Sequence, residues 1–134
     1  MLSAAQDLAA RHPVWDALAS MFLDSDASSS RVWRSQVLAV SPYSALDLEE
    51  ILITEVYPIC WSKLNAAAAD ERLAFAPGAL AAMILRREAS PEIVARLVEL
   101  ARQAVPRSRE WQATKAAIAS LRCAAADGQV CGQA

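Results

Sequence analysis

The scarcity of glycine constrains the fold of this chain more than any other feature. Only three glycines occur in 134 residues, and none precedes Gly78. Most turn-rich β architectures are ruled out, because their tight turns need residues that readily adopt positive φ angles. Thirty alanines and a hydrophobic fraction of 55% favour closely packed helices, and a net charge of -2 argues against disorder. We therefore expect an all-α fold.

Local start signals mark where most of the helices begin. They are an N-cap serine, a proline in the first turn, or both, at Pro13, Ser44, Pro77, Ser90-Pro91 and Ser108. A further helix is predicted from about Arg31 to Val40, where apolar residues recur every three or four positions. The sequence thus predicts a single helical domain over residues 1–134, a compact bundle of five to seven helices with no sheet. Residues 1–10 and 128–134 are expected to fray.

The apolar positions of these helices define a predicted core. The helix predicted from about Arg31 to Val40 has two sides. The side expected to face water consists of Arg31, Arg34 and Ser35. The side expected to face the core, which we call the inner stripe, consists of Val32, Trp33, Gln36, Val37 and Val40. The helix after Ser44 is apolar around most of its circumference, so it is either central or covered by a second copy. Pro58 is expected to end or kink it. The predicted core consists of Trp15, Leu18, Phe22, Trp33, Val37, Leu48, Ile51, Leu52, Ile84, Leu97 and Leu121.

Charge is distributed unevenly along the chain. Up to Cys60, eight acids and three arginines give -5, and from Trp61 onward ten basic residues and seven acids give +3. The acidic half predicts a binding surface for a protein partner, such as a toxin or effector, with a basic surface. The candidate contact residues are Asp24, Asp26, Asp47, Glu49, Glu50 and Trp61. The alternative is that the two halves neutralise each other within the fold.

The sequence contains no recognisable catalytic or metal-binding constellation. The single histidine, His12, precedes Pro13 at a predicted helix start, where a surface or capping role is expected. Asp24 and Asp26 form a DxD pair that lacks the other carboxylates and the glycine of a calcium loop. No GxSxG, GxGxxG or P-loop motif occurs. We therefore expect neither enzymatic activity nor a cofactor or metal.

Glu55 interrupts the apolar arc of the helix after Ser44. A carboxylate drawn toward a core must be paired or protonated, so Glu55 is expected to be ion-paired or to have a perturbed pKa. Cys60 and Cys123 are expected to behave as small apolar residues, although a Cys123–Cys131 disulfide is geometrically feasible. The N-terminus lacks the pattern of a secretory signal, and no apolar run could span a bilayer. A cytoplasmic protein without a membrane segment is therefore expected.

Two stretches resemble a known family. Residues 12–26 read HPVWDALASMFLDSD, which is similar to HPVWxALSxLFLDTE. Residues 38–65 read LAVSPYSALDLEEILITEVYPICWSKLN, which is similar to SxYSLxELExILxxEVxP. These patterns are typical of a family of small uncharacterised bacterial helical proteins, and the resemblance covers roughly residues 11–85. The sequence departs from the family at Ser25-Asp26, where Thr-Glu is usual, and at Leu73, where tryptophan is usual. The resemblance implies a bacterial helical domain and supplies no catalytic residues.

Together these features favour a non-enzymatic protein-binding module. The leading hypothesis is an immunity or antitoxin-like protein that neutralises a toxin by occlusion. It rests on the lack of catalytic motifs, the acidic N-terminal half and the small helical scaffold. A secretion chaperone or adaptor for an effector is an alternative with the same composition. A nucleic-acid-binding regulator using the basic residues after Arg86 is another, against which interspersed glutamates and a pI of about 5.4 count. A homodimer also stays open.

Overall fold

The computed structural model describes residues 6–23, 27–60, 84 and 91–125, and the regular structure within these ranges is entirely helical. The all-α prediction is therefore confirmed for this part of the chain. Its five α-helices are α1 (Leu8–Leu23), α2 (Arg31–Val40), α3 (Ala45–Ile51), α6 (Pro91–Ala104) and α7 (Arg109–Ala125). The helix predicted to begin at Pro77 lies outside the described residues.

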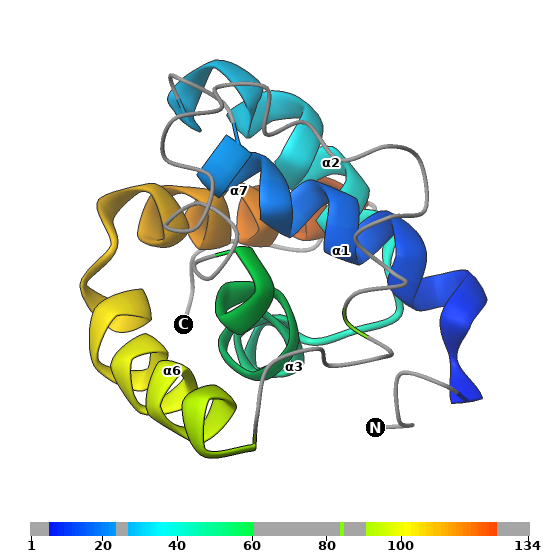
Figure 1. Ribbon diagram of the computed structural model, residues 1–134. Coiled ribbons are helices and arrows are strands. Elements are labelled where there is room, and N and C mark those ends of the chain that lie inside the picture. Colours follow the sequence, from blue (N-terminus) through cyan, green and yellow to red (C-terminus); the bar gives the residue numbers. More distant parts are fainter. Residues whose placement is uncertain (1–5, 24–26, 61–83, 85–90, 126–134) are drawn as a thin grey trace.

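The helices are grouped around α3 and its continuation (Figure 1). α2 lies between α1 and α7 and contacts both of them. The helical turn that follows α3 contacts α1 on one side and α6 on another. A 3-10 turn, Val105–Arg107, links α6 to α7. The α3 segment is therefore central, one of the two alternatives expected from its apolar circumference, and it is covered largely by helices of the same chain.

The α3 segment begins at the predicted N-cap, Ser44, and continues through Pro58, which was expected to end or kink it. The Ser44 side chain accepts a hydrogen bond from the backbone N–H of Asp47 at 3.1 Å, as expected of an N-cap. After Ile51 the chain forms a π-helical turn, Leu52–Val56, and then stays helical to residue 60. Pro58 therefore does not end the helix. The wider turn immediately before it helps to accommodate a residue that has no N–H to donate.

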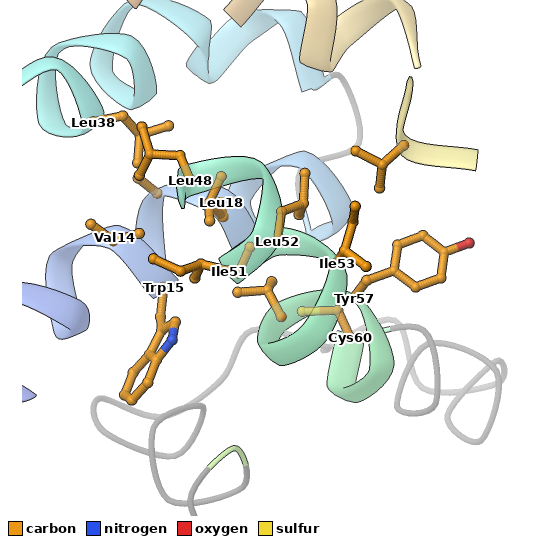
Figure 2. Packing of buried hydrophobic residues seen from close by; sticks show 14 of the residues in the cluster. Val14, Trp15, Leu18, Leu38, Leu48, Ile51, Leu52, Ile53, Tyr57 and Cys60 are labelled. Carbon is orange, nitrogen blue, oxygen red and sulfur yellow. The ribbon is translucent and has the colours of Figure 1, made fainter. Parts of the chain in front are cut away.

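The core is formed mainly where α1 meets the α3 segment (Figure 2). Of the predicted core residues, seven are buried: Trp15, Leu18, Leu48, Ile51, Leu52, Ile84 and Leu97. Phe22 and Val37 are partly buried and pack against this cluster. Trp33 and Leu121 were predicted to be buried, but 48% and 37% of their surfaces are exposed. These two exceptions lie on neighbouring helices, Trp33 on α2 and Leu121 on α7.

α1 begins earlier than the proline signal predicts. It starts at Leu8, so Pro13 lies inside the helix rather than in its first turn. The backbone N–H of Arg11 already donates to the Asp7 carbonyl at 3.0 Å. Buried contacts made by the Arg11 side chain favour this extra turn, although Pro13 gives up one intrahelical hydrogen bond. Tertiary interactions thus override the local signal.

The starts of α6 and α7 agree with their sequence signals. α6 begins at Pro91, the predicted first helical position. Ser108 caps α7, because its hydroxyl oxygen accepts the Trp111 backbone N–H at 3.1 Å. Within the described ranges, no helix has both the length and the apolar character needed to cross a membrane. Cys60 is a buried free thiol, and Cys123 is disulfide-bonded; Cys131 lies outside the described residues.

Candidate protein-binding surface

The predicted acidic surface is described only in part. Asp24, Asp26 and Trp61 lie outside the described residues, so the structure does not place them. Asp47 lies in the first turn of α3 and is partly exposed. A carboxylate there interacts favourably with the positive end of the helix dipole, and it stays accessible to a partner.

Glu49 and Glu50 are occupied by contacts within the chain. Glu50 accepts two hydrogen bonds from Arg102 of α6, at 3.1 and 2.9 Å, which hold the pKa of its carboxyl below the usual value. Glu49 accepts the indole N–H of Trp111 at 2.8 Å and pairs with Lys115 at 3.1 Å. At these two acids, the acidic and basic halves of the chain neutralise each other, which was the alternative expectation.

α2 directs its polar side toward the interior. Arg34 is completely buried, and its Nη1 donates to Glu110 Oε2 at 2.9 Å and to Thr114 Oγ1 at 3.0 Å, both on α7. Its Nε donates to the Ser20 hydroxyl of α1 at 2.9 Å, and its Nη2 donates to the Ser30 hydroxyl at 2.8 Å. These partners offset the cost of burying the guanidinium. The prediction that Arg34 faces water is therefore wrong.

Glu110 is the shared acceptor that joins the two arginines of α2. Arg31 donates to it through Nε at 2.6 Å and through Nη2 at 2.8 Å, in addition to the bond from Arg34. The hydrogen bond from Arg31, opposed by partial burial and helped by Arg34, lowers the pKa of Glu110. These hydrogen-bonded ion pairs therefore hold α2 and α7 together near the first turns of both helices.

As a result, the apolar side of α2 faces outward. The exposed fractions of Val32, Trp33 and Val40 are 71%, 48% and 85%. Gln36 is also exposed and Val37 is partly buried, whereas Ser35 and Leu38 are buried on the opposite side. The predicted inner stripe is thus the outer one. We define the outer face as Val32, Trp33, Gln36, Val37 and Val40 of α2 together with Leu121 of α7.

A shallow groove of about 190 Å³ lies at one end of the outer face. It is lined from α2 by Gln36, Ala39 and Val40 and from α7 by Leu121, Arg122 and Ala125. The Arg122 guanidinium is directed at the end of α2, where it donates to four backbone carbonyl oxygens, those of Leu38, Ala39, Ser41 and Tyr43, at 2.6 to 3.3 Å. The groove is therefore mainly apolar, and its single cation is occupied.

A second buried arginine holds α1 against the α3 segment. Arg11 Nη1 donates to both carboxylate oxygens of Glu55, at 2.8 and 2.7 Å, and Trp15 Nε1 donates to Glu55 Oε1 at 2.9 Å. Arg11 Nε donates to the Tyr43 hydroxyl at 3.1 Å, and that hydroxyl donates to Asp7. Glu55 is thus ion-paired, one of the two outcomes expected for it. This cluster is internal and offers no surface to a partner.

Acid–base or thiol chemistry finds little support among the described residues. A pocket of about 130 Å³ near the α6–α7 turn has Glu110 as its one carboxylate, and the arginines hold it ionised. Burial raises the pKa of the Cys60 thiol to about 12, so it stays protonated at neutral pH. His12 is exposed, with its ring 5.6 Å from that of Trp15. Among the described residues, no group of three or more metal-ligating side chains occurs.

The outer face was missed because hydrophobicity alone defined the inner stripe. A second stripe with helical spacing exists in α2: Arg31, Arg34, Ser35 and Leu38. Glu110 and Thr114 lie one turn apart on α7, the spacing that presents both to one neighbouring helix. Complementary polar stripes on two predicted helices are a signal that could have revealed this packing.

A family model described as "Domain of unknown function (DUF7079)" matches residues 9–118. This range includes α2, α3 and α6, all of α1 except its first residue, and the part of α7 that carries Glu110 and Thr114. No curated protein matches the chain, and no solved structure matches it. The match agrees with the resemblance found in the sequence and assigns no activity.

Proposed function

The chain belongs to the DUF7079 family, and we propose that it is a non-enzymatic protein-binding module that acts by occluding a partner. The single observation that carries the proposal is the outward apolar side of α2. Its polar side is fixed inward by the buried contacts of Arg34, so the exposure of Val32, Trp33 and Val40 is built into the packing.

Exposed apolar side chains scattered singly need no explanation, but a cluster on one helix face does. Trp33, which is 48% exposed, is the natural anchor of the outer face, since tryptophan is enriched at the energetically important positions of protein interfaces. The groove beside Val40 and Leu121 gives the face a concave end into which a partner side chain fits. A partner that contacts this face covers apolar surface with apolar surface.

An immunity or antitoxin-like protein is the class that we propose. Such a protein needs a rigid surface and no catalytic group, and α2 is held rigidly by its contacts with both α1 and α7. Because Glu49 and Glu50 are occupied by Lys115 and Arg102, we place the main contact on the outer face and leave Asp47 as an accessory acid. A client-binding secretion chaperone stays the second candidate, because an apolar helix face also fits an amphipathic client segment.

Nucleic-acid binding is less well supported by the contacts of the basic half. Arg102 and Lys115 pair with acids of α3, and Arg122 binds backbone carbonyl oxygens. Binding to phosphates depends on cations that face solvent in a common patch. Three of the basic residues that the regulator hypothesis needs are thus engaged in contacts within the chain, although Arg102 itself is exposed.

Co-expression with the product of the neighbouring gene tests the proposal. We expect a stable complex and, for the immunity class, relief of the toxicity of that product. Val40→Glu should weaken the complex at least tenfold, because it places a charge on the outer face. Leu100→Glu is the matched control, since Leu100 is 48% exposed on α6, away from α2 (Figure 1). The absence of a complex and of relief would contradict the proposal. A complex only with truncated or unfolded client segments would favour the chaperone.

A further inference from the structure

We propose that the pocket of about 130 Å³ beside the α6–α7 turn binds a neutral, single-ring aromatic compound that carries a hydrogen-bond donor, such as a phenol. The pocket shares no lining residue with the outer face, so the inference goes beyond the proposed function. It follows from three properties of the described residues: the size of the pocket, its aromatic lining, and the hydrogen bonds and charge of its one carboxylate, Glu110.

The size of the pocket sets the size of its ligand. The pocket lies where the end of α1, the α3 segment and the α6–α7 turn meet, and it is partly open to solvent. A protein cavity of about 150 Å³ holds one benzene ring, so the volume suits a single ring with at most a small substituent. Typical small-molecule sites measure roughly 300–1,000 Å³, so a nucleotide or a cofactor with fused rings is too large.

The lining of the pocket favours an aromatic ring. Phe22 and Tyr57 pack edge to face, with ring centroids 5.6 Å apart and an angle of 82° between the rings. Trp111 is fully buried, and its indole N–H is used by Glu49, so it contributes apolar ring surface to the pocket. A ligand ring can add further edge-to-face contacts to this pair and can contact the thioether of Met21.

Glu110 supplies an acceptor for a donor on the ligand. Its Oε2 accepts from Arg31 Nε at 2.6 Å and from Arg34 Nη1 at 2.9 Å, and its Oε1 accepts from Arg31 Nη2 at 2.8 Å. An ionised carboxylate offers about four acceptor positions, so among the contacts of the described residues one position on Oε1 stays open. The Glu110 side chain is 17% exposed, which leaves this oxygen within reach of a bound hydroxyl.

The charges around Glu110 favour a neutral ligand. Two guanidinium groups, those of Arg31 and Arg34, already compensate the carboxylate, so a cationic ligand gains no net attraction there. An anionic ligand would meet the carboxylate oxygen directly and would be left without a donor. A hydroxyl group avoids both costs, because it donates a hydrogen bond and brings no charge.

NMR titration of the full chain at neutral pH with four single-ring compounds of similar size tests the inference. We expect para-cresol to bind with a dissociation constant on the order of millimolar or below and to shift the resonances of Met21 and Trp111. Toluene lacks the donor and should bind at least about fivefold more weakly. Benzylamine, a cation, and benzoate, an anion, should show no binding up to roughly 10 mM.

Two alanines of α6 provide a matched pair of variants. Ala104 lines the pocket and Ala95 does not, and both are exposed. Ala104→Phe should weaken the binding of para-cresol at least about tenfold, because its ring occupies part of a pocket that holds only one ring. Ala95→Phe should bind like the wild type, and so should Val40→Glu, since the outer face lies apart from the pocket.

Several results would overturn the inference. They are a lack of para-cresol binding, resonance shifts that avoid Met21 and Trp111, toluene or benzylamine binding as tightly as para-cresol, and unchanged affinity in a folded Ala104→Phe variant. If Ala104→Phe fails to fold, the four ligands and the shifts in the wild-type chain still decide. The product of the neighbouring gene takes no part in this experiment, so its result is independent of the proposed function.

Discussion

Arg34 of α2 and Glu110 of α7 are 76 residues apart in the sequence and form a hydrogen-bonded ion pair of 2.9 Å in the interior. Arg102 and Glu50 form a pair with the same 2.9 Å separation on the surface, where the two side chains are 51% and 44% exposed. The two pairs have the same chemistry and differ in burial. The buried pair fixes which side of α2 faces outward, so the proposed binding surface depends on it.

Replacement of Arg34 by alanine should lower the free energy of unfolding by about 3–5 kcal/mol, because it removes one partner of a buried ion pair. Ser20 and Thr114 lose their contacts with the guanidinium at the same time. Arg102→Ala is the matched control and should leave the stability unchanged within error, because water solvates Glu50 after the change. Urea unfolding of both variants measures the difference. Equal effects for the two variants would mean that α2 does not depend on its buried arginine.

Glu110 should make the protein sensitive to acid. Hydrogen bonding from Arg31, together with Arg34, holds its pKa below the ordinary value of 4.5. The resulting stabilisation is present above the unfolded pKa and is lost as the pH falls through 4.5 and then through the lower folded pKa. The stability difference between wild type and Glu110→Gln should therefore shrink between neutral pH and about pH 3, since protonated Glu110 resembles glutamine.

Urea unfolding at several pH values measures this difference, with Glu50→Gln as the control. The pKa of Glu50 is also lowered, mainly by its hydrogen bond with Arg102. The stability difference between wild type and Glu50→Gln should therefore also shrink as the pH falls. The exposed Glu50 pair should contribute less and respond more strongly to salt. A constant difference between wild type and Glu110→Gln across the pH range would contradict the assignment.

Ser35 should be dispensable, in contrast to Ser20, which is also buried. The Ser35 hydroxyl is the one buried side-chain polar atom without a hydrogen-bond partner in the described part of the chain. Ser35→Ala should be neutral or should raise the free energy of unfolding by about 1 kcal/mol, because it removes an unsatisfied group from a helix interior. Thermal or urea unfolding is the measurement.

Ser20→Ala provides the contrast to Ser35→Ala. The Ser20 hydroxyl donates to the Ala17 carbonyl at 2.6 Å and accepts from Arg34 Nε at 2.9 Å. Removal of the Ser20 hydroxyl leaves the buried Nε–H of Arg34 without this acceptor and should lower the free energy of unfolding by about 1–3 kcal/mol. The opposite ranking of the two serine variants would refute the hydrogen-bond arrangement around Arg34.

Much of the fold could be predicted from local signals. The caps at Ser44 and Ser108 and the proline at position 91 mark real helix starts, because capping depends on residues three or four positions away. The α3 core was also predictable, since a helix that is apolar on most sides must be enclosed. These features need no information from distant parts of the chain.

The orientation of α2 could not be predicted in the same way. Its hydrophobic pattern favours one side, but the interior partners of Arg34 come from α1 and α7 and lie 14 to 80 residues away in the sequence. A helical wheel of α2 shows only the residues of α2, so it gives no information about partners on α1 and α7. The same limit explains the early start of α1, where the contact of Arg11 with Glu55 spans 44 residues. At the candidate site, the pairing of Glu49 and Glu50 likewise depends on α6 and α7.

The orientation of α2 is the central claim, and one comparison tests it most directly. Leu38 is fully buried and Val40, two residues later, is 85% exposed. Urea unfolding of Leu38→Asp and Val40→Asp should be measured at a concentration where the chain is monomeric, so that self-association does not contribute. We predict that Leu38→Asp loses at least about 3 kcal/mol or fails to fold, while Val40→Asp stays within about 0.5 kcal/mol of the wild type. A Val40→Asp variant destabilised as strongly as Leu38→Asp would show that the apolar side of α2 faces the core.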